Sequence, residues 1–269
     1  MYKEEFSSIF ELMNTLKERP NNRFMRDEHS SQKISNSGWS GTTTYEEAKS
    51  LLIYGYNDPI KNIKSNLTKN KKLVSSKIYN LIPKPIAANQ VVGFVPNVPN
   101  TLMGLPKSMI SVEKINRKKK TISIIYAIGG AAMVGTEALE SAGAALISAI
   151  NLIELAGIQT RLSIGFIPTV HGRQIIFPTV NIKNFNERFS LQKICFPMVH
   201  PSMFRRIGFK YLETCPGMEE DFSCGYGRPA SLEEIKTCLK EKDTYIINRE
   251  WITDHGNNIE EILKYMEVC

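Results

Sequence analysis

The sequence lacks the short motifs that mark the most common catalytic sites. No GxGxxG, GxxxxGK[ST], HExxH or GxSxG pattern occurs in its 269 residues. These patterns bind dinucleotides, bind nucleoside triphosphates, hold a catalytic zinc ion and carry a serine nucleophile, respectively. Their absence leaves only sites that are assembled from residues far apart in the chain. We therefore expect no cofactor and no enzyme of these four classes.

Cysteine is scarce, and its spacing does not suggest pairing. The five cysteines are an odd number and include no CxxC pair. Such usage is typical of a reducing compartment. Cys215 and Cys224 with His200 form the only loose cluster, and unpaired thiols explain it better than a zinc site, so we expect no metal.

Long uninterrupted apolar runs are also missing. Residues 1–23 carry charges throughout, so we expect no cleaved leader and no secretion. The most apolar stretch, residues 127–157, is interrupted by Glu137, Glu140 and Glu154, and charges at bilayer depth are costly. We interpret this stretch as a buried strand and helix and expect no membrane partner.

The composition that remains is typical of a globular, basic protein. Hydrophobic residues make up 42% and charged residues 23%, and the net charge is +7. The excess lies in a lysine-rich stretch over residues 61–84 and in a run over residues 117–120 that includes Lys118, Lys119 and Lys120. Such runs bind nucleic acid in many proteins. Neither run contains aromatics that would stack on bases, so a solvated linker and turn remain the alternative.

Residues 1–56 predict a helical N-terminal arm. Pro20 ends a first amphipathic helix, and Thr44 with Glu47 forms a capping box that starts a second one, which Gly55 ends. Five apolar residues of the first helix recur at helical spacing: Phe6, Ile9, Phe10, Met13 and Leu16.

Residues 57–120 predict a basic connector followed by a proline-rich loop layer. Pro96, Pro99 and Pro106 exclude a regular central strand from the passage VVGFVPNVPNTLMGLPKSMI. The apolar content of this passage is too high to be left in water, so we expect it to be ordered.

Residues 121–269 predict an α/β core with a Rossmann-like sheet flanked by helices. Residues 121–128 are β-branched and apolar at nearly every position, as in a strand buried on both faces. A helix over 137–156 and a strand over 159–167 complete a crossover unit, and a short turn leads to an antiparallel strand over 173–182. Four small residues predict close approach of the helix to the sheet: Ala142, Gly143, Ala145 and Ala149.

The last third of the chain continues this alternation. Residues 185–195 and 201–213 look helical, Ser231 with Glu234 forms a capping box, residues 244–248 form a strand, and a helix follows Asn258.

Two places could bind a ligand. In HPSMFRRIGF, His200 could transfer protons near neutral pH, while Arg205 and Arg206 could hold a phosphate or carboxylate, although helix packing explains the same residues. Gly129 and Gly130 open a loop that leads to a helix start, where free amides attract anions. The apolar residues that follow them favour packing against protein.

Several blocks of the sequence resemble known proteins. GWSGTTTYEEAKSLLIYG, VVGFVPNVPNTLMGLPKSM and FPMVHPSMFRRIGFKYLE together resemble a family of uncharacterised tailed-bacteriophage proteins. The order of strand, helix, strand and antiparallel strand resembles von Willebrand factor A domains, including that of Ro-type RNA-binding proteins. Metal binding in that fold needs the oxygen ligands of Asp-x-Ser-x-Ser after the first strand. At that place this sequence has YAIGG, residues 126–130, whose one side-chain oxygen is the Tyr126 phenol, so we expect no metal site of this type.

The resemblance implies a viral protein of the host cytoplasm or the virion. We expect a non-enzymatic interaction protein, a scaffold, virion component or host modulator that contacts a viral or host protein or a second copy of itself. Binding of RNA or DNA through the basic runs is one alternative, and binding or modification of a nucleotide is another.

Overall fold

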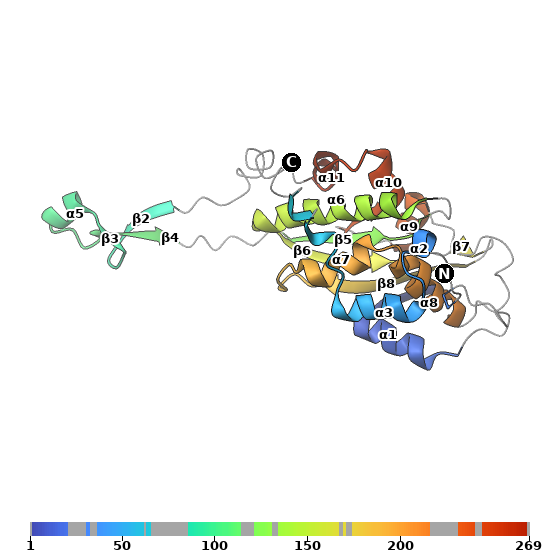
Figure 1. Cartoon of the computed structure of the whole chain (residues 1–269). Helices are drawn as coiled ribbons and strands as arrows, with labels where there is room; N and C mark the ends of the chain where they lie inside the picture. The colour runs from blue at the N-terminus through green and yellow to red at the C-terminus, as the bar shows by residue number, and fades with distance from the viewer. Residues whose placement is uncertain are drawn as a thin grey trace.

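The computed structural model has a mixed α/β fold in which helices flank a five-stranded, mostly parallel sheet (Figure 1). It describes residues 2–20, 31–32, 37–61, 63–65, 86–113, 121–130, 134–166, 169–170, 174–215, 231–239 and 244–267. The strands of the sheet lie in the order β1 (Tyr2–Phe6), β8 (Gln174–Lys183), β6 (Gln159–Gly165), β5 (Thr121–Ala127) and β9 (Thr244–Asn248). A short strand, β7 (Thr169–Val170), pairs with β8.

The helices pack on both faces of this sheet. Those that precede the sheet's central strands are α1 (Ile9–Glu18), α2 (Ser37–Ser40) and α3 (Tyr45–Tyr54). Those that follow are α6 (Thr136–Leu155), α7 (Leu191–Val199), the π-helix η1 (Met203–Gly208), α8 (Phe209–Thr214), α9 (Leu232–Leu239), α10 (Arg249–Asp254) and α11 (Ile259–Tyr265).

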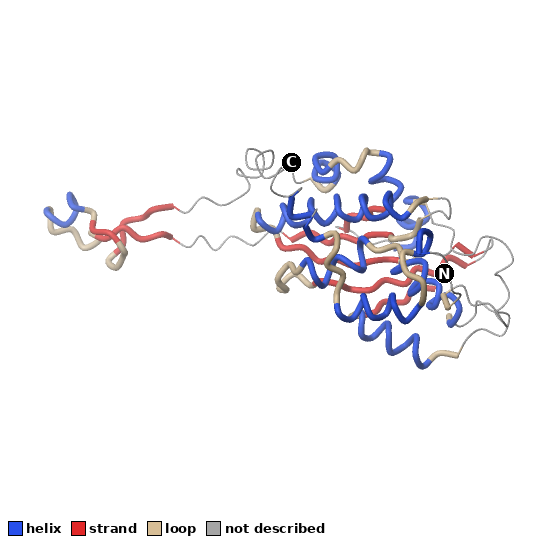
Figure 2. Tube along the Cα trace, in the orientation of Figure 1, coloured by secondary structure: helices blue, strands red, loops and turns tan. Residues whose placement is uncertain are grey.

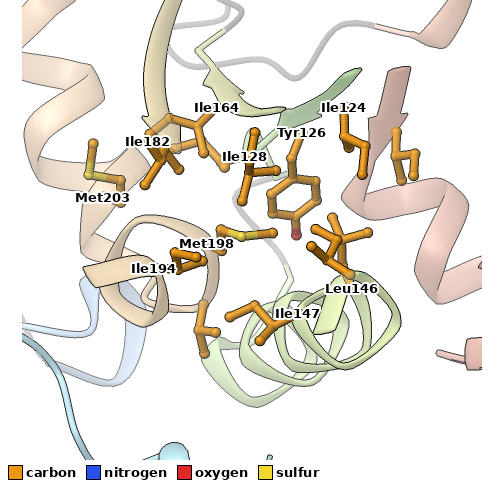
Figure 3. Close-up of a cluster of buried hydrophobic side chains, with 14 of the residues drawn as sticks. Ile124, Tyr126, Ile128, Leu146, Ile147, Ile164, Ile182, Ile194, Met198 and Met203 are labelled. Atoms are coloured by element: carbon orange, nitrogen blue, oxygen red, sulfur yellow. The ribbon is translucent and has the colours of Figure 1, made fainter. Parts of the chain in front are cut away.

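Strand β5 is buried on both faces, as its sequence predicts. Ile124 and Tyr126 point toward α6 and α7 and join the larger core cluster (Figure 3). Ile125 and Ala127 point the other way and pack with Ile235 of α9. Alternate side chains of a strand face opposite sides, so a continuous apolar run needs cover on both.

The crossover unit and the hairpin are confirmed. β5 pairs in parallel with β6, and α6 connects them. β6 then pairs antiparallel with β8, while β9 joins the other side of β5 in parallel. The capping box before α9 is also present, because the Ser231 N–H donates to Glu234 at 2.7 Å and the Glu234 N–H donates to Ser231 Oγ at 3.3 Å.

The N-terminal region is part of the main sheet, which differs from the arm expected over residues 1–56. Residues Tyr2–Phe6 form β1, which pairs in parallel with β8 at the edge of the sheet. Phe6 fits the helical spacing of the residues after it, so the sequence placed it in the first helix instead of in a five-residue strand. Helices α1 and α3 form as expected, and Glu47 N–H donates to the Thr44 hydroxyl at 3.2 Å.

Helix α6 packs on the sheet at β6, as expected, and at Gly143 it also lies very close to another helix, α7. A Cβ built on Gly143 would lie 2.4 Å from the Met198 carbonyl oxygen of α7. By length and composition α6 is apolar enough to cross a membrane, yet most of it is buried in this fold. Its apolar surface is therefore used by the protein core.

Other elements differ from the sequence expectation in extent. α7 begins at Leu191, after a stretch without regular structure, instead of at residue 185. The helix expected over 201–213 is divided into η1 and α8, and α10 was not expected at all.

A second, three-stranded sheet lies apart from this main body in Figures 1 and 2. It consists of β2 (Ile86–Gln90), β4 (Met109–Glu113) and β3 (Val95–Pro96), with β4 in the centre, and includes α5 (Val98–Leu102). We call residues 86–113 the apolar unit and the remaining described residues the main body. The expected loop layer thus contains strands, and Pro96 occupies a two-residue edge strand, where a missing N–H is tolerated.

Candidate functional sites

Arg206 is buried and binds the chain's own backbone. Its guanidinium, on the π-helix η1, is 1% exposed and donates to the carbonyl oxygens of Ser31 at 3.1 Å, Thr42 at 3.0 Å and Thr43 at 2.9 Å. It also donates to Ser40 Oγ at 3.1 Å. Burial lowers the pKa of Arg206, but the group remains a cation surrounded by acceptors.

Arg205, the residue before Arg206, binds the backbone of the same N-terminal region at Trp39. It donates to the Trp39 carbonyl oxygen and, at 2.8 Å, to that of Val134, and it stacks 4.7 Å over the Trp39 ring. Burial, and secondarily the charge of Arg249, lowers the pKa of Arg205 to about 10. A guanidinium this deep is stabilised by carbonyl dipoles.

His200 is a packed, neutral side chain. Its ring stacks on Phe196 with centroids 4.9 Å apart and meets Tyr56 edge-on at 4.6 Å, while Nδ1 accepts the Ser202 N–H at 3.2 Å. Burial lowers its pKa to about 4. The ring is therefore uncharged near neutral pH and is poorly suited to proton transfer there.

The HPSMFRR segment therefore holds Ser31 and residues 39–43 in place by hydrogen bonds. Ser202 adds to it, since its hydroxyl donates to the Ser40 carbonyl oxygen at 2.5 Å and lies 2.9 Å from Thr42 Oγ1. A ligand site expected at His200, Arg205 and Arg206 is occupied by the protein itself. The packing interpretation accounts for all three residues.

The remaining predicted site residues lie in two places. Gly129 and Gly130 follow β5 and are buried, and a Cβ on Gly130 would lie 2.9 Å from Leu139 of α6. Lys118, Lys119 and Lys120 lie outside the described residues. Within the described ranges, no group of three or more His, Cys, Asp and Glu side chains could hold a metal ion.

The apolar unit exposes its large apolar side chains to solvent. Leu102 is 83% exposed, Val92 is 80% exposed and Phe94 is 65% exposed. The other large apolar residues exposed in the unit are Val91, Val95, Val98, Met103 and Leu105. None of residues 87–111 is buried, so this sheet has no core of its own.

Hydrogen bonds give the apolar unit its shape. The Asn97 N–H donates to the Ser108 carbonyl oxygen at 2.7 Å, and the Asn100 side-chain amide donates to that of Lys107 at 3.2 Å. Gly93 lies so close to β4 that a Cβ would be 2.3 Å from the Ile110 carbonyl oxygen. Small sheets normally have an apolar face packed on another element, whereas none of residues 87–111 of this unit is buried.

A groove of about 950 Å³ lies on the main body between α1 and α3, and the segment between β8 and α7 closes one side. Phe10, Ile53 and Tyr54 line it and remain 72%, 49% and 76% exposed. Ile9 and Met13 of α1 lie below them and pack against the core. The groove is thus a second exposed apolar surface, concave where the apolar unit protrudes.

The class of protein defined by these observations is a mixed α/β protein with a packed main body and two exposed apolar surfaces. The chain matches the model of the family described as Domain of unknown function (DUF7192) over residues 1–268, and it belongs to that family. No match was found among curated proteins or among solved structures.

The composition of residues 91–105 is the one sequence signal for the apolar unit. Residues 91–105 carry large apolar side chains between prolines, with no charge, and the spacing matches neither helix nor strand. We expected an ordered loop layer whose apolar side chains are kept out of water, whereas in the structure the large apolar side chains of this run face solvent. The groove leaves no local signal, because α1, α3 and residues 181–193 come together only in the fold.

Proposed function

We propose that this is a non-enzymatic interaction protein that docks onto another protein through the apolar unit. The observation that carries the proposal is the exposure of eight large apolar side chains in the apolar unit, where none of residues 87–111 is buried. Large exposed apolar patches are rare on soluble monomers and mark interaction sites. Hydrogen bonds hold the backbone that carries these side chains, so less backbone ordering remains to be paid on binding.

A protein partner fits the chemistry of this surface better than nucleic acid does. Within residues 87–111 only Lys107 is charged, and the aromatic residue Phe94 stands alone. Nucleic-acid surfaces need several cations for phosphates and aromatic rings for bases. Protein interface centres, by contrast, are depleted of charge and rich in apolar side chains.

We also propose a viral origin and a Rossmann-like, von Willebrand factor A-like sheet. The resemblance of the three sequence blocks to tailed-bacteriophage proteins supports the first, with action in the host cytoplasm or the virion. The chain order β5, α6, β6 and antiparallel β8 supports the second. Scaffold, virion component and host modulator are all roles that such a docking protein could have.

Site-specific photo-crosslinking in cells that naturally produce the protein tests the proposal. The photoreactive residue p-benzoylphenylalanine replaces Phe94 in one variant and Leu102 in another, and replaces Leu155 in the control. Leu155 is 61% exposed at the end of α6, outside both apolar surfaces. We expect a discrete protein adduct from positions 94 and 102 and none from position 155.

The adduct from position 94 must also disappear when Leu102→Glu is added, which separates docking from random collision. A nuclease-sensitive adduct, a lipid adduct, or equal adducts from position 155 would each contradict the proposal.

Nucleic-acid binding is the second candidate, and the net charge of +7 favours it. Replacing Lys118, Lys119 and Lys120 with alanine then weakens RNA or DNA binding at low salt and reduces the salt dependence of the binding constant. Filter binding at two salt concentrations measures both quantities. Unchanged binding would exclude these three lysines as the contact.

A further inference from the structure

We propose that the apolar unit of one copy docks into the groove between α1 and α3 of a second copy, so that the chain assembles head to tail. This inference rests on the proposed function and names its partner. It joins the two surfaces that carry all the exposed large apolar side chains of the described residues except Leu155, and a monomer leaves both in water. One contact between copies covers both of them.

One of the two surfaces protrudes and the other is concave. The apolar unit protrudes from the chain (Figure 1), with Phe94 and Leu102 exposed. The groove is concave and holds about 950 Å³, with Phe10 and Tyr54 exposed at its mouth. One partner contributes roughly 20–30 residues to a standard interface. Residues 86–113 and the residues that line the groove are each of that number.

Five cations and two carboxylates line the groove, and most of these charges are already paired within the chain. Nucleic acid or an acidic peptide would have to compete for the cations of the rim, whereas residues 87–111 carry a single charge, Lys107. Three of those cations are already held by carboxylates of the same chain: Arg19 by Glu4, Lys49 by Glu46 at 3.3 Å, and Lys193 by Glu187 at 3.0 Å. A neutral apolar segment enters without breaking these ion pairs.

The contact joins two different surfaces, so its symmetry differs from that of a twofold dimer. Each copy has one protruding and one concave surface, and each can therefore bind two neighbours. Such heterologous contacts produce rings when the rotation closes and open filaments when it does not.

A mixing experiment with the full chain tests this arrangement. The first variant carries Phe94→Glu and Leu102→Glu, which charge the apolar unit and leave the groove intact. The second carries Phe10→Glu and Tyr54→Glu, which charge the groove and leave the unit intact. All four side chains are exposed, so both variants should fold, and circular dichroism melts checked against the control Leu155→Glu confirm this.

Analytical ultracentrifugation over a concentration series gives the result. We expect concentration-dependent multimers for the unaltered chain and for Leu155→Glu. Each double variant alone is expected to be monomeric, with association at least roughly tenfold weaker, because a charge would be buried in an apolar contact. An equimolar mixture should form 1:1 dimers and nothing larger, since it retains one intact unit and one intact groove.

Three results would overturn the inference: a monomeric unaltered chain at high concentration, multimers of the groove variant, or a mixture that remains monomeric. The first would mean that the unit binds another partner or its own groove, and the second that units bind one another. Crosslinks from position 94 to a different protein would then leave the proposed function standing. Absence of any protein crosslink would end both.

Discussion

Leucine and phenylalanine have opposite environments in the main body and in the apolar unit. Leu146 and Phe196 are 0% and 1% exposed, whereas Leu102 and Phe94 are 83% and 65% exposed. Both regions have regular strands and helices, so local structure does not explain the difference. The main body buries its apolar side chains within one chain, and the unit presents the same side chains outward on a hydrogen-bonded frame.

The most direct way to break this comparison is the same substitution in both regions. Leu146→Ala should cost about 2–5 kcal/mol of the free energy of unfolding, because it leaves a cavity beside β5 and α7. Leu102→Ala should change that free energy by less than about 0.5 kcal/mol. Urea unfolding followed by circular dichroism measures both. An equal loss at Leu102 would mean that the unit is packed in the monomer.

A second prediction concerns the arginine that fastens the N-terminal segment. Arg206→Met should cost about 3 kcal/mol or more, since the carbonyl oxygens of Ser31, Thr42 and Thr43 lose a buried donor and each such loss costs about 1–3 kcal/mol. The matched control is Arg161→Met, which removes an ion pair with Glu5 that is half exposed and worth at most about 1 kcal/mol.

Thermal unfolding of the two variants decides between fastening and ligand binding at Arg206. Equal small losses in both would show that its guanidinium is free for a ligand.

The pH dependence of stability should reveal the burial of His200. Its pKa is lowered by burial from 6.5 to about 4, so the folded state favours the neutral ring. Below pH 6.5 the unfolded state takes up a proton at His200, while the folded state does not. The free energy of unfolding therefore has its full value above pH 6.5 and falls as the pH drops toward 4. The loss amounts to about 3 kcal/mol.

Urea unfolding of His200→Gln at pH 7 and pH 4.5 isolates this contribution from that of the carboxylates, which titrate in both proteins. The variant should lose less stability between the two pH values than the unaltered chain. The same loss in both would place an exposed, ordinary histidine at this position.

The smallest effect predicted for the main body is at the contact between α6 and α7. Gly143→Ala should destabilise the fold by about 1–3 kcal/mol, because the new Cβ meets the Met198 carbonyl oxygen at 2.4 Å. Helix propensity alone predicts the opposite sign, since alanine favours helix over glycine by about 1 kcal/mol. A rise in melting temperature would contradict the close packing of these helices.

The sequence predicted those parts of the fold in which pattern and environment agree. Thr121–Ala127 is β-branched or apolar at nearly every position, which is typical of an interior strand, and Ser231 with Glu234 marks a helix start by local hydrogen bonds alone. Strand β1 was missed because five residues give too short a pattern, and its partner β8 lies far away in the sequence.

The candidate sites were harder to predict, because burial decides their role. Arg205 and Arg206 have the same sequence pattern whether they bind a phosphate or a carbonyl oxygen, and only the fold brings Ser31 and residues 39–43 to them. Residues 91–105 have the composition of a buried core, and no local pattern in them predicts that their side chains are exposed to solvent.

Hydrogen exchange of the full chain, measured by mass spectrometry at low and high protein concentration, tests the central claim most directly. At low concentration the amides of residues 86–113 should exchange much faster than those of β5 and α6, because no apolar cover opposes their local opening. At high concentration they should become protected together with α1 and α3. Slow exchange of the unit at the lowest concentration, or no change with concentration at either surface, would contradict the account.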